Sequence, residues 1–213
     1  MSDRNYWDRY SRKYDASLRW MLGRPLPRLV ELASEAVRGK RRVLEVAAGT
    51  GIVTAAIARS SETVVATDYA AGMVDVLTER IGNLGLSNVT CEQADIYALP
   101  FAEGEFDAVV AANVLHLVPD LPAALTAMRR VLQPGGKIVV PTFCHDETKV
   151  SGFVSRLLAI SGFPGQRRFT VRSLNDALEG NGVQISRAET LAGLIPVGYV
   201  EGVFASPETP HSN

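Results

Sequence analysis

The sequence has little of what holds small secreted proteins and zinc domains together. Only two cysteines occur, Cys91 and Cys144, and they lie far apart in the chain. A single pair forms no disulfide framework, and it lacks the second pair that a cysteine zinc site requires. We therefore expect two reduced thiols, no metal site and a cytoplasmic protein.

Long apolar runs are also missing. No uninterrupted apolar stretch approaches the ~20 residues that a helix needs to cross a bilayer. The first stretch, MSDRNYWDRYSRKYD, is charged where a secretory signal carries an apolar segment. We expect neither membrane insertion nor an ordinary secretory signal.

The chain has no excess of one charge sign. Its 22 Lys and Arg residues nearly balance 23 Asp and Glu residues, which leaves a net charge of −1. A balanced surface offers no general attraction to nucleic acid or to an anionic membrane. A small-molecule partner is therefore expected, and no nucleic acid.

What the sequence does contain is typical of a folded globular protein. Of its 213 residues, 46% are apolar and 21% are charged. This length supports one sizeable core and is short for two ordinary domains, so we expect a single domain over 1–213.

Strand-like and helical patterns alternate after Arg41. The expected strands are RRVLEVA, ETVVATD, NVTCEQAD, FDAVVAAN and GKIVVPTF, each apolar on both faces. Between them, apolar residues recur at helical spacing in 52–59, 72–84 and 121–132. This alternation predicts an α/β protein with a parallel sheet and helices on both of its faces.

The C-terminal part breaks the alternation. Two strand-like runs, VQISRAETLA and LIPVGYVEGVFA, have only Gly193 at their junction, which predicts an antiparallel hairpin. Ahead of them, 147–160 and 171–180 have helical patterns, separated by the Gly- and Pro-containing loop SGFPGQRRFT. The region up to Arg38 is also expected to be helical, interrupted by GRPLPR.

The first glycine loop follows a strand that ends near an acid. Glu45 precedes AAGTG, and a helix is expected from about Ile52. Ligands of open α/β sheets bind beyond the carboxyl ends of the strands, and small residues allow a ligand to approach the backbone there. Gly49 and Gly51 could equally form only a tight strand-to-helix turn, and the loop alone does not decide between these interpretations.

The next two strands also end at acids. Asp68 is placed to accept both hydroxyls of a ribose, although it could instead cap the following helix. For a bound ribose, Tyr69 and Met73 would then lie beside an adenine, or either could simply pack in the core. Asp95 could accept from the exocyclic amine of adenine while Ile96 packs on its ring. Asp95 alone would be interpreted as a surface acid, but three acids at three successive strand ends favour a ligand site.

The fourth strand is followed by Asn113 and His116. His116 is a candidate general base, because its unperturbed pKa of about 6.5 suits proton removal at neutral pH. The alternative is a histidine packed between Leu115 and Leu117. We favour packing on the sequence, because neither a nucleophile nor a partner for the base can be identified.

These motifs, in this order, resemble those of the class I S-adenosylmethionine (SAM)-dependent methyltransferases. LEVAAGTG resembles the first motif of that family, TDYAAGM the second and ADIYALPF the third, and FDAVVAANVLHLV and VLQPGGKIVV resemble the segments that follow. The resemblance covers about Val43 to Phe143 and is strongest to the small-molecule group that includes the ubiquinone/menaquinone-biosynthesis methyltransferases. It implies a Rossmann-like, seven-stranded, mainly parallel sheet whose C-terminal hairpin is antiparallel.

The resemblance also implies roles for single residues. Glu45 and the backbone of Ala47 to Gly51 would hold the methionine portion of SAM, Asp68 its ribose, and Asp95 with Ile96 its adenine. Ala47 replaces the usual glycine of the family, and its small methyl group should still allow binding.

The remaining implied roles concern the reacting end of the cofactor. Asn113 and His116 would lie near the methyl-bearing sulfur. Tyr14, in the aromatic stretch YWDRYSRKYD, would cover the sulfonium, and Tyr10 less so; ordinary helix packing is the alternative for both.

The expected organisation follows from this resemblance. It comprises an N-terminal helical cap (1–40), a SAM-binding core (41–143), a lid helix and loop for the acceptor (144–170), a last helix with the hairpin (171–205) and a tail (206–213). The lid region would suit an apolar acceptor through Phe153, Leu157, Leu158 and Ile160, although these residues could equally belong to the core. Arg156, Arg167 and Arg168 could bind an anionic group on the acceptor, or simply lie in solvent.

The expected activity is direct SN2 transfer of a methyl group from SAM to a small-molecule acceptor, with S-adenosylhomocysteine as product. SAM carries an already activated methyl group, so alignment and exclusion of water are the main requirements, with His116 as the candidate base. Two alternatives remain: a non-catalytic SAM-binding scaffold of the same fold, and an NAD-dependent oxidoreductase. NAD is disfavoured because AAGTGIVT lacks the third glycine of GxGxxG and NAD leaves Glu45 unexplained.

Overall fold

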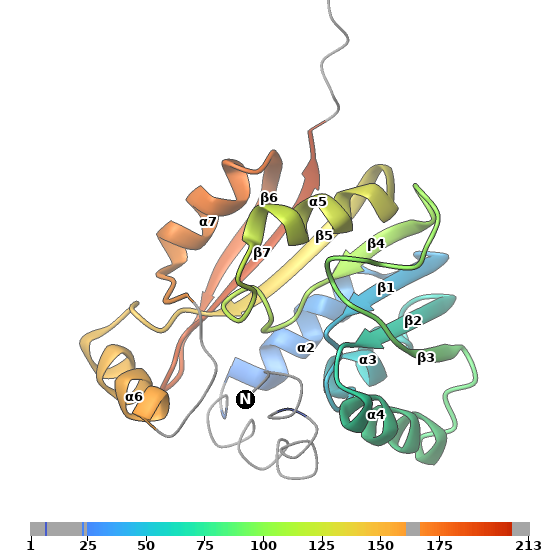
Figure 1. Ribbon diagram of the computed structural model, residues 1–213, viewed down its shortest axis with the longest axis horizontal. Coiled ribbons are helices and arrows are strands. Elements are labelled where there is room, and N and C mark those ends of the chain that lie inside the picture. The colour runs from blue at the N-terminus through green and yellow to red at the C-terminus, as the bar shows by residue number, and fades with distance from the viewer. Residues whose placement is uncertain (1–6, 8–22, 24, 161–166, 206–213) are drawn as a thin grey trace, which may run out of the picture.

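The computed structural model of the protein describes Trp7, Gly23 and residues 25–160 and 167–205, with backbone only for 155–160. Elements carry the labels of Figure 1. Tyr10 and Tyr14 lie outside the described residues, as does the tail. None of the described helices is long and apolar enough to cross a membrane.

Seven strands form one sheet in the order β3-β2-β1-β4-β5-β7-β6. The strands are β1 (Arg42–Val46), β2 (Thr63–Asp68), β3 (Val89–Gln93), β4 (Phe106–Val110), β5 (Leu132–Phe143), β6 (Val183–Leu191) and β7 (Val197–Phe204). The first five are parallel, and β7 is antiparallel to both β5 and β6. The mainly parallel sheet with a C-terminal hairpin is therefore confirmed.

The order in which strands are added to the sheet reverses between β1 and β4, although the two strands are parallel. The chain runs from β1 outward through β2 to β3, then returns to place β4 on the other side of β1. Loops from neighbouring strands leave in opposite directions at such a switch point and open a crevice at the carboxyl ends. The topology thus predicts a ligand crevice next to the carboxyl end of β1.

Helices cover both faces of the sheet (Figure 1). One core contains apolar residues of α2 (Pro25–Ala36), α3 (Ile52–Ile57) and α4 (Ala71–Asn83). The other contains those of α5 (Leu121–Val131) and α7 (Val171–Glu179). Burial on both faces explains why the central strands are almost continuously apolar in sequence.

Strand β3 differs from the expectation that every strand is apolar on both faces. β4 is buried at all five positions, whereas β3 has no fully buried position and exposes Thr90 and Gln93. β3 lies at the edge of the sheet, where one long side has no neighbouring strand. Its sequence, VTCEQ, accordingly mixes apolar and polar residues.

The hairpin connection is longer than the single glycine at the junction suggests. β6 ends at Leu191 and β7 begins at Val197, so the connection comprises 192–196. A Cβ atom at Gly193 would lie 2.5 Å from Cγ of Pro25, the first residue of α2. Gly193 is therefore required by the close approach of the hairpin to α2.

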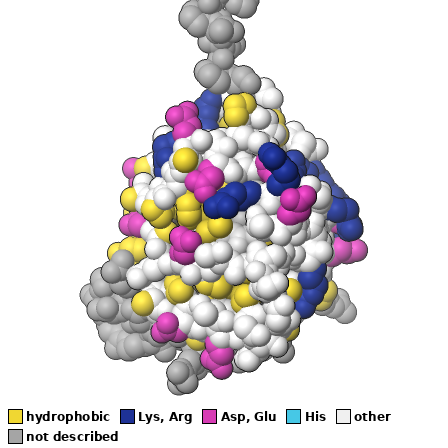
Figure 2. Space-filling model, turned by 90° about the vertical axis from the view of Figure 1, so that its right-hand side faces the viewer, with side chains coloured by type: hydrophobic (Ala, Val, Ile, Leu, Met, Phe, Trp, Pro, Cys, Tyr) yellow, Lys and Arg dark blue, Asp and Glu magenta, His cyan; other side chains and the backbone are white. Residues whose placement is uncertain are grey.

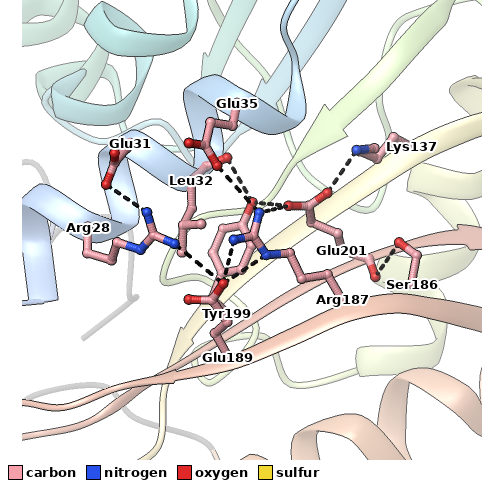
Figure 3. A network of polar contacts seen from close by, with 10 residues as sticks. All are labelled: Arg28, Glu31, Leu32, Glu35, Lys137, Ser186, Arg187, Glu189, Tyr199 and Glu201. Atoms are coloured by element: carbon pink, nitrogen blue, oxygen red, sulfur yellow. Dashed lines mark hydrogen bonds and ion pairs between the residues drawn. The ribbon is translucent and has the colours of Figure 1, made fainter.

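Helix α2 is tied to the sheet by a polar network around Tyr199 (Figure 3). The buried Tyr199 hydroxyl lies 3.0 Å from the carbonyl oxygen of Leu32 and 2.9 Å from Oε1 of Glu201. Lys137 Nζ donates to the other Glu201 oxygen at 2.8 Å. These contacts join α2 to β5 and β7 and fix the helix on its face of the sheet.

The surface mixes both signs of charge. On the face shown in Figure 2, basic and acidic side chains are interspersed, with hydrophobic side chains between them. This pattern agrees with the balanced composition of the chain.

The helix α6 (Lys149–Ile160) is the expected extra element after β5. Figure 1 shows it at the periphery of the molecule, beyond the carboxyl end of β5. Its described part exposes two large apolar side chains, Val150 and Phe153, each more than 60% accessible. Side chains of Arg156, Leu157, Leu158 and Ile160 lie outside the described part.

Candidate functional site

A cavity of about 330 Å³ opens at the carboxyl ends of β1 to β4. The residues that line it are Trp7, Val46, Ala47, Gly49, Thr67, Asp68, Tyr69, Met73, Ala94, Asp95, Ile96, Tyr97, Ala112, Asn113, Val114, Leu117, Val118 and Pro119. Its volume is that of a site for a small organic ligand, and its lining combines a mainly apolar wall with a few polar groups. The crevice predicted from the strand order is therefore present.

The structure brings most of the candidate residues into this cavity. Eight of them line it: Ala47, Gly49, Asp68, Tyr69, Met73, Asp95, Ile96 and Asn113. Glu45, Gly51 and His116 do not line it, and Tyr14 lies outside the described residues.

The loop after β1 is bound to the end of β2. The N–H of Gly49 donates to Oδ2 of Asp68 at 2.8 Å, and the N–H of Ala48 donates to the carbonyl oxygen of Thr67 at 2.9 Å. Ala47 has a φ of 52°, in the left-handed region that glycine occupies without strain. An alanine there costs about 1 kcal/mol or more, and such strain is concentrated at ligand sites.

Asp68 is oriented by two backbone donors. Its Oδ1 accepts from the N–H of Ala70 at 3.0 Å, in addition to the bond from Gly49. The cap residue of α4 is Ala70, which makes no side-chain cap bond, so Asp68 does not cap this helix itself. These two donors, one on each carboxylate oxygen, fix the orientation of Asp68 at the edge of the cavity.

The end of β3 forms a compact turn around Asp95. Its Oδ1 accepts from the N–H of Tyr97 at 3.0 Å, and its carbonyl oxygen accepts from the N–H of Ala98 at 2.9 Å. The Tyr97 hydroxyl accepts from the N–H of Asp120 at 3.0 Å. Tyr97 thus connects the loop after β3 with the loop after β4, on the other side of the cavity.

Glu45 lies below the loop. Its side chain is 1% accessible, and its Oε2 accepts a hydrogen bond from the Thr54 hydroxyl at 2.6 Å. Burial raises the pKa of Glu45 to about 8; the Thr54 hydrogen bond opposes this rise and the nearby Asp68 adds to it. A positive charge brought close to Glu45 would favour its ionised form.

Gly51 is required for packing inside the protein. It has a φ of 82°, and a Cβ atom on it would lie 2.4 Å from Cδ1 of Leu77 in α4. The tight-turn interpretation therefore accounts for Gly51, whereas Gly49 also lines the cavity.

Asn113 and His116 lie on opposite sides of the cavity wall. Asn113 lines the cavity with a φ of 53°, and its N–H donates to the carbonyl oxygen of Pro141 at 2.6 Å. His116 is 1% accessible and packs edge-on to Phe143 at 5.5 Å between ring centroids, with His145 at 5.2 Å. Burial, and secondarily His145, lower the pKa of His116 well below its usual value, so the imidazole is neutral at neutral pH.

The two described arginines of the lid region are engaged with the protein. Arg167 donates to the carbonyl oxygens of Val118 and Pro119, the latter at 2.8 Å, and its N–H donates to the carbonyl oxygen of His116. Arg168 forms a paired contact with the Asp146 carboxylate, the shortest at 2.7 Å. Arg167 therefore holds the wall of the cavity.

Several lining residues were not predicted from the sequence. They include Trp7, Thr67, Tyr97 and the Leu117–Pro119 segment. Trp7 belongs to the aromatic stretch in which Tyr14 was singled out, and Tyr97 directly follows Ile96. Both could have been found by considering every aromatic residue next to the predicted motifs.

The chain is similar to known methyltransferases. Residues 44–140 match the family described as methyltransferase domain. The demethylmenaquinone methyltransferase of Renibacterium salmoninarum is 42% identical over 118 residues, 55% of this chain and 47% of that protein. The ubiquinone/menaquinone biosynthesis C-methyltransferase of Pseudoalteromonas translucida is 36% identical over 123 residues, 56% of this chain and 49% of that protein. The aligned part of the chain thus spans about half the length of these curated relatives.

A solved structure extends the likeness to the whole fold. The SAM-dependent methyltransferase of Aquifex aeolicus superposes with a TM-score of 0.73 at 19% identity, over 93% of this chain and 98% of that one. The seven-stranded mixed sheet is therefore the methyltransferase fold. Over residues 44–140 the chain is therefore similar to methyltransferases, and its fold is that of a SAM-dependent methyltransferase structure.

Proposed function

We propose that this protein binds SAM in the cavity at the ends of β1 to β4 and transfers its methyl group to a small-molecule acceptor. The observation that carries the proposal is the arrangement of the three acids: Asp68 and Asp95 line one cavity, and Glu45 lies below the loop that borders it. SAM is proposed as the cofactor because of the similarity to the methyltransferase domain and to a SAM-dependent methyltransferase structure.

The residues of the cavity fit the chemical groups of SAM. Asp68, held by two backbone N–H groups, has acceptor capacity for the ribose hydroxyls. Asp95 and the half-buried Ile96 are proposed to hold the adenine, with Tyr69 and Met73 beside it. The methionine ammonium would lie over the Ala47–Gly51 loop, above Glu45.

Methyl transfer places few demands on the protein. SAM supplies an electrophilic methyl group on a sulfonium. The wall formed by Asn113 and 117–119 would orient the acceptor and exclude water, which is the larger part of what a direct SN2 transfer requires. His116 remains the candidate base for an acceptor that loses a proton. Its neutral imidazole can accept one, but it lies behind the cavity wall.

The acceptor is proposed to be apolar. The exposed Val150 and Phe153 of α6 provide apolar surface in the lid region. The relatives named above are methyltransferases of menaquinone and ubiquinone biosynthesis, so quinol and phenol compounds are the first acceptors to test.

A ligand-induced stabilisation tests cofactor choice. S-adenosylhomocysteine at 100 times its dissociation constant should stabilise the protein by about 2.7 kcal/mol, whereas NADH should produce no shift. The absence of a shift with S-adenosylhomocysteine, or a clear shift with NADH, contradicts the proposal.

A second experiment separates an enzyme from a SAM-binding scaffold. The protein is incubated with SAM and an extract of the source cell, and products that gain one methyl group are sought by mass spectrometry. Binding of S-adenosylhomocysteine without any methylated product, from the extract or from a panel of quinols, phenols, amines and thiols, would favour the scaffold.

A further inference from the structure

The buried contact between Thr54 and Glu45 joins α3 to β1 beneath the loop that borders the cavity. Thr54 lies in the first turn of α3, is fully buried, and donates its hydroxyl proton to Oε2 of Glu45 at 2.6 Å. This distance is at the short end for a hydroxyl–oxygen hydrogen bond. Glu45 is itself 1% accessible and belongs to the central strand β1.

Within the interior of a helix, a threonine hydroxyl commonly bonds the carbonyl four residues earlier in the same helix. Thr78 in α4 does so, donating to the carbonyl oxygen of Val74 at 2.8 Å. Thr54 lies in the first turn of α3, where the residue four earlier precedes the helix, and its hydroxyl bonds across to the strand. Its β-branched side chain keeps few rotamers, so the direction of the bond is well defined.

We propose that Thr54 is a positioning residue of the cofactor site, which orients the Glu45 carboxylate and favours its charged form for the ammonium group of the cofactor. This inference rests on the proposed SAM binding. It assigns the role to a residue that does not line the cavity and acts only through Glu45.

The electrostatics of the site give Thr54 this influence. Burial is the largest contribution to the raised pKa of Glu45, and Asp68 raises it further. The Thr54 hydrogen bond acts in the opposite direction, because a hydroxyl donor stabilises the carboxylate more than the neutral acid. Loss of this donor would leave Glu45 protonated over a wider pH range.

Binding of a cationic group next to Glu45 is then coupled to proton release. At a pH below the pKa of the free site, Glu45 must lose its proton before its carboxylate can stabilise an ammonium group above the loop. Affinity should therefore increase as the pH rises toward about 8, the pKa of Glu45 in the free protein. The hydrogen bond from Thr54 lowers the pKa of Glu45, so it moves this increase in affinity to lower pH.

Calorimetric titration with S-adenosylhomocysteine tests the proposal. The ligand carries the same amino-acid portion and is titrated between about pH 6 and 9 in buffers of different ionisation enthalpy, which reports the protons released on binding. Thr54→Val removes the hydroxyl at nearly equal volume, and Thr54→Ser keeps it. Affinity of Thr54→Val at pH 7 should fall about tenfold, with its pH profile displaced to higher pH, because a hydrogen bond to a charged group is lost. Thr54→Ser should follow the unaltered protein.

The outcomes are distinguishable. If the unaltered protein does not bind S-adenosylhomocysteine, the proposed function fails. If it binds and Thr54→Val has the same pH profile and proton release, or merely a uniformly lower affinity, the inference about Thr54 is overturned. Should Thr54→Val not fold, Thr54→Ala is measured in its place and judged by the same two results.

Discussion

The carboxylate of Asp68 accepts a hydrogen bond from the backbone of Gly49 at 2.8 Å, so the end of β2 and the loop after β1 form one unit. The other oxygen of the carboxylate accepts from the N–H of Ala70, the N-cap residue of α4. A single side chain thereby organises three segments around the cavity. These contacts hold the loop in place, and a loop that is already ordered lowers the entropy cost of ligand binding.

Replacement of Asp68 by alanine should abolish the stabilisation by S-adenosylhomocysteine. The change removes both the acceptor for the ribose and the partner of Gly49. The expected thermal shift on ligand addition is zero within error, compared with about 2.7 kcal/mol of stabilisation for the unaltered protein at 100 times its dissociation constant. Asp75→Ala, an exposed change in α4, the helix that follows Asp68, is the matched control and should keep the full shift.

Replacement of Gly51 by alanine should destabilise the fold. The new methyl group would lie 2.4 Å from Leu77 Cδ1, and the residue has a φ of 82°. Overpacking costs about 1–3 kcal/mol, and the left-handed backbone adds about 1–2 kcal/mol. Urea denaturation measures the loss.

The control for this change is Gly39→Ala. Gly39 has a φ of 70°, but no atom lies within 4 Å of its Cβ position, so only the backbone contribution should remain. Equal losses for the two variants would show that the contact with Leu77 is unimportant.

The strands and the order of the motifs were predictable because each depends on local sequence. Fully buried strands such as β4 require continuous apolar residues, and acids at strand ends stand out against them. Asp68 and Asp95 can therefore be selected as candidates from the sequence, and both line the same cavity in the structure.

Features that depend on distant contacts were not predictable. Gly51 looks like its neighbour Gly49 in sequence, yet its missing side chain leaves room for Leu77, which lies in another helix. Similarly, Arg167 resembles a surface arginine, and only the fold shows that it reaches the carbonyl oxygens of Val118 and Pro119. Such pairings are set by how the elements pack, and one sequence carries no signal for them.

Glu45→Gln should change how stability depends on pH. The pKa of Glu45 is raised from an ordinary value of 4.5 to about 8 in the folded protein, mainly by burial. Its protonated form therefore stabilises the fold fully below about pH 4.5, and this contribution is lost as the pH rises through about 8, with a slope of at most about 1.4 kcal/mol per pH unit. The free energy of unfolding of the variant should lack this decline.

The comparison is made by urea denaturation of both proteins at a series of pH values between 4 and 9. Glu103→Gln, at an exposed position, is the control and should keep the pH dependence of the unaltered protein. A difference between Glu45→Gln and the unaltered protein that stays constant with pH would refute the prediction.

Arg167→Ala should weaken ligand binding without direct contact to the ligand. Arg167 does not line the cavity, but it donates to the carbonyl oxygens of Val118 and Pro119, which do. Each hydrogen bond lost contributes about 1 kcal/mol, so a looser wall should lower the affinity for S-adenosylhomocysteine several-fold. The exposed Arg172→Ala removes the same charge from a nearby helix and should leave affinity unchanged. Similar losses in the two variants would assign the effect to charge, and the loss in Arg167→Ala alone would assign it to the support of the cavity wall.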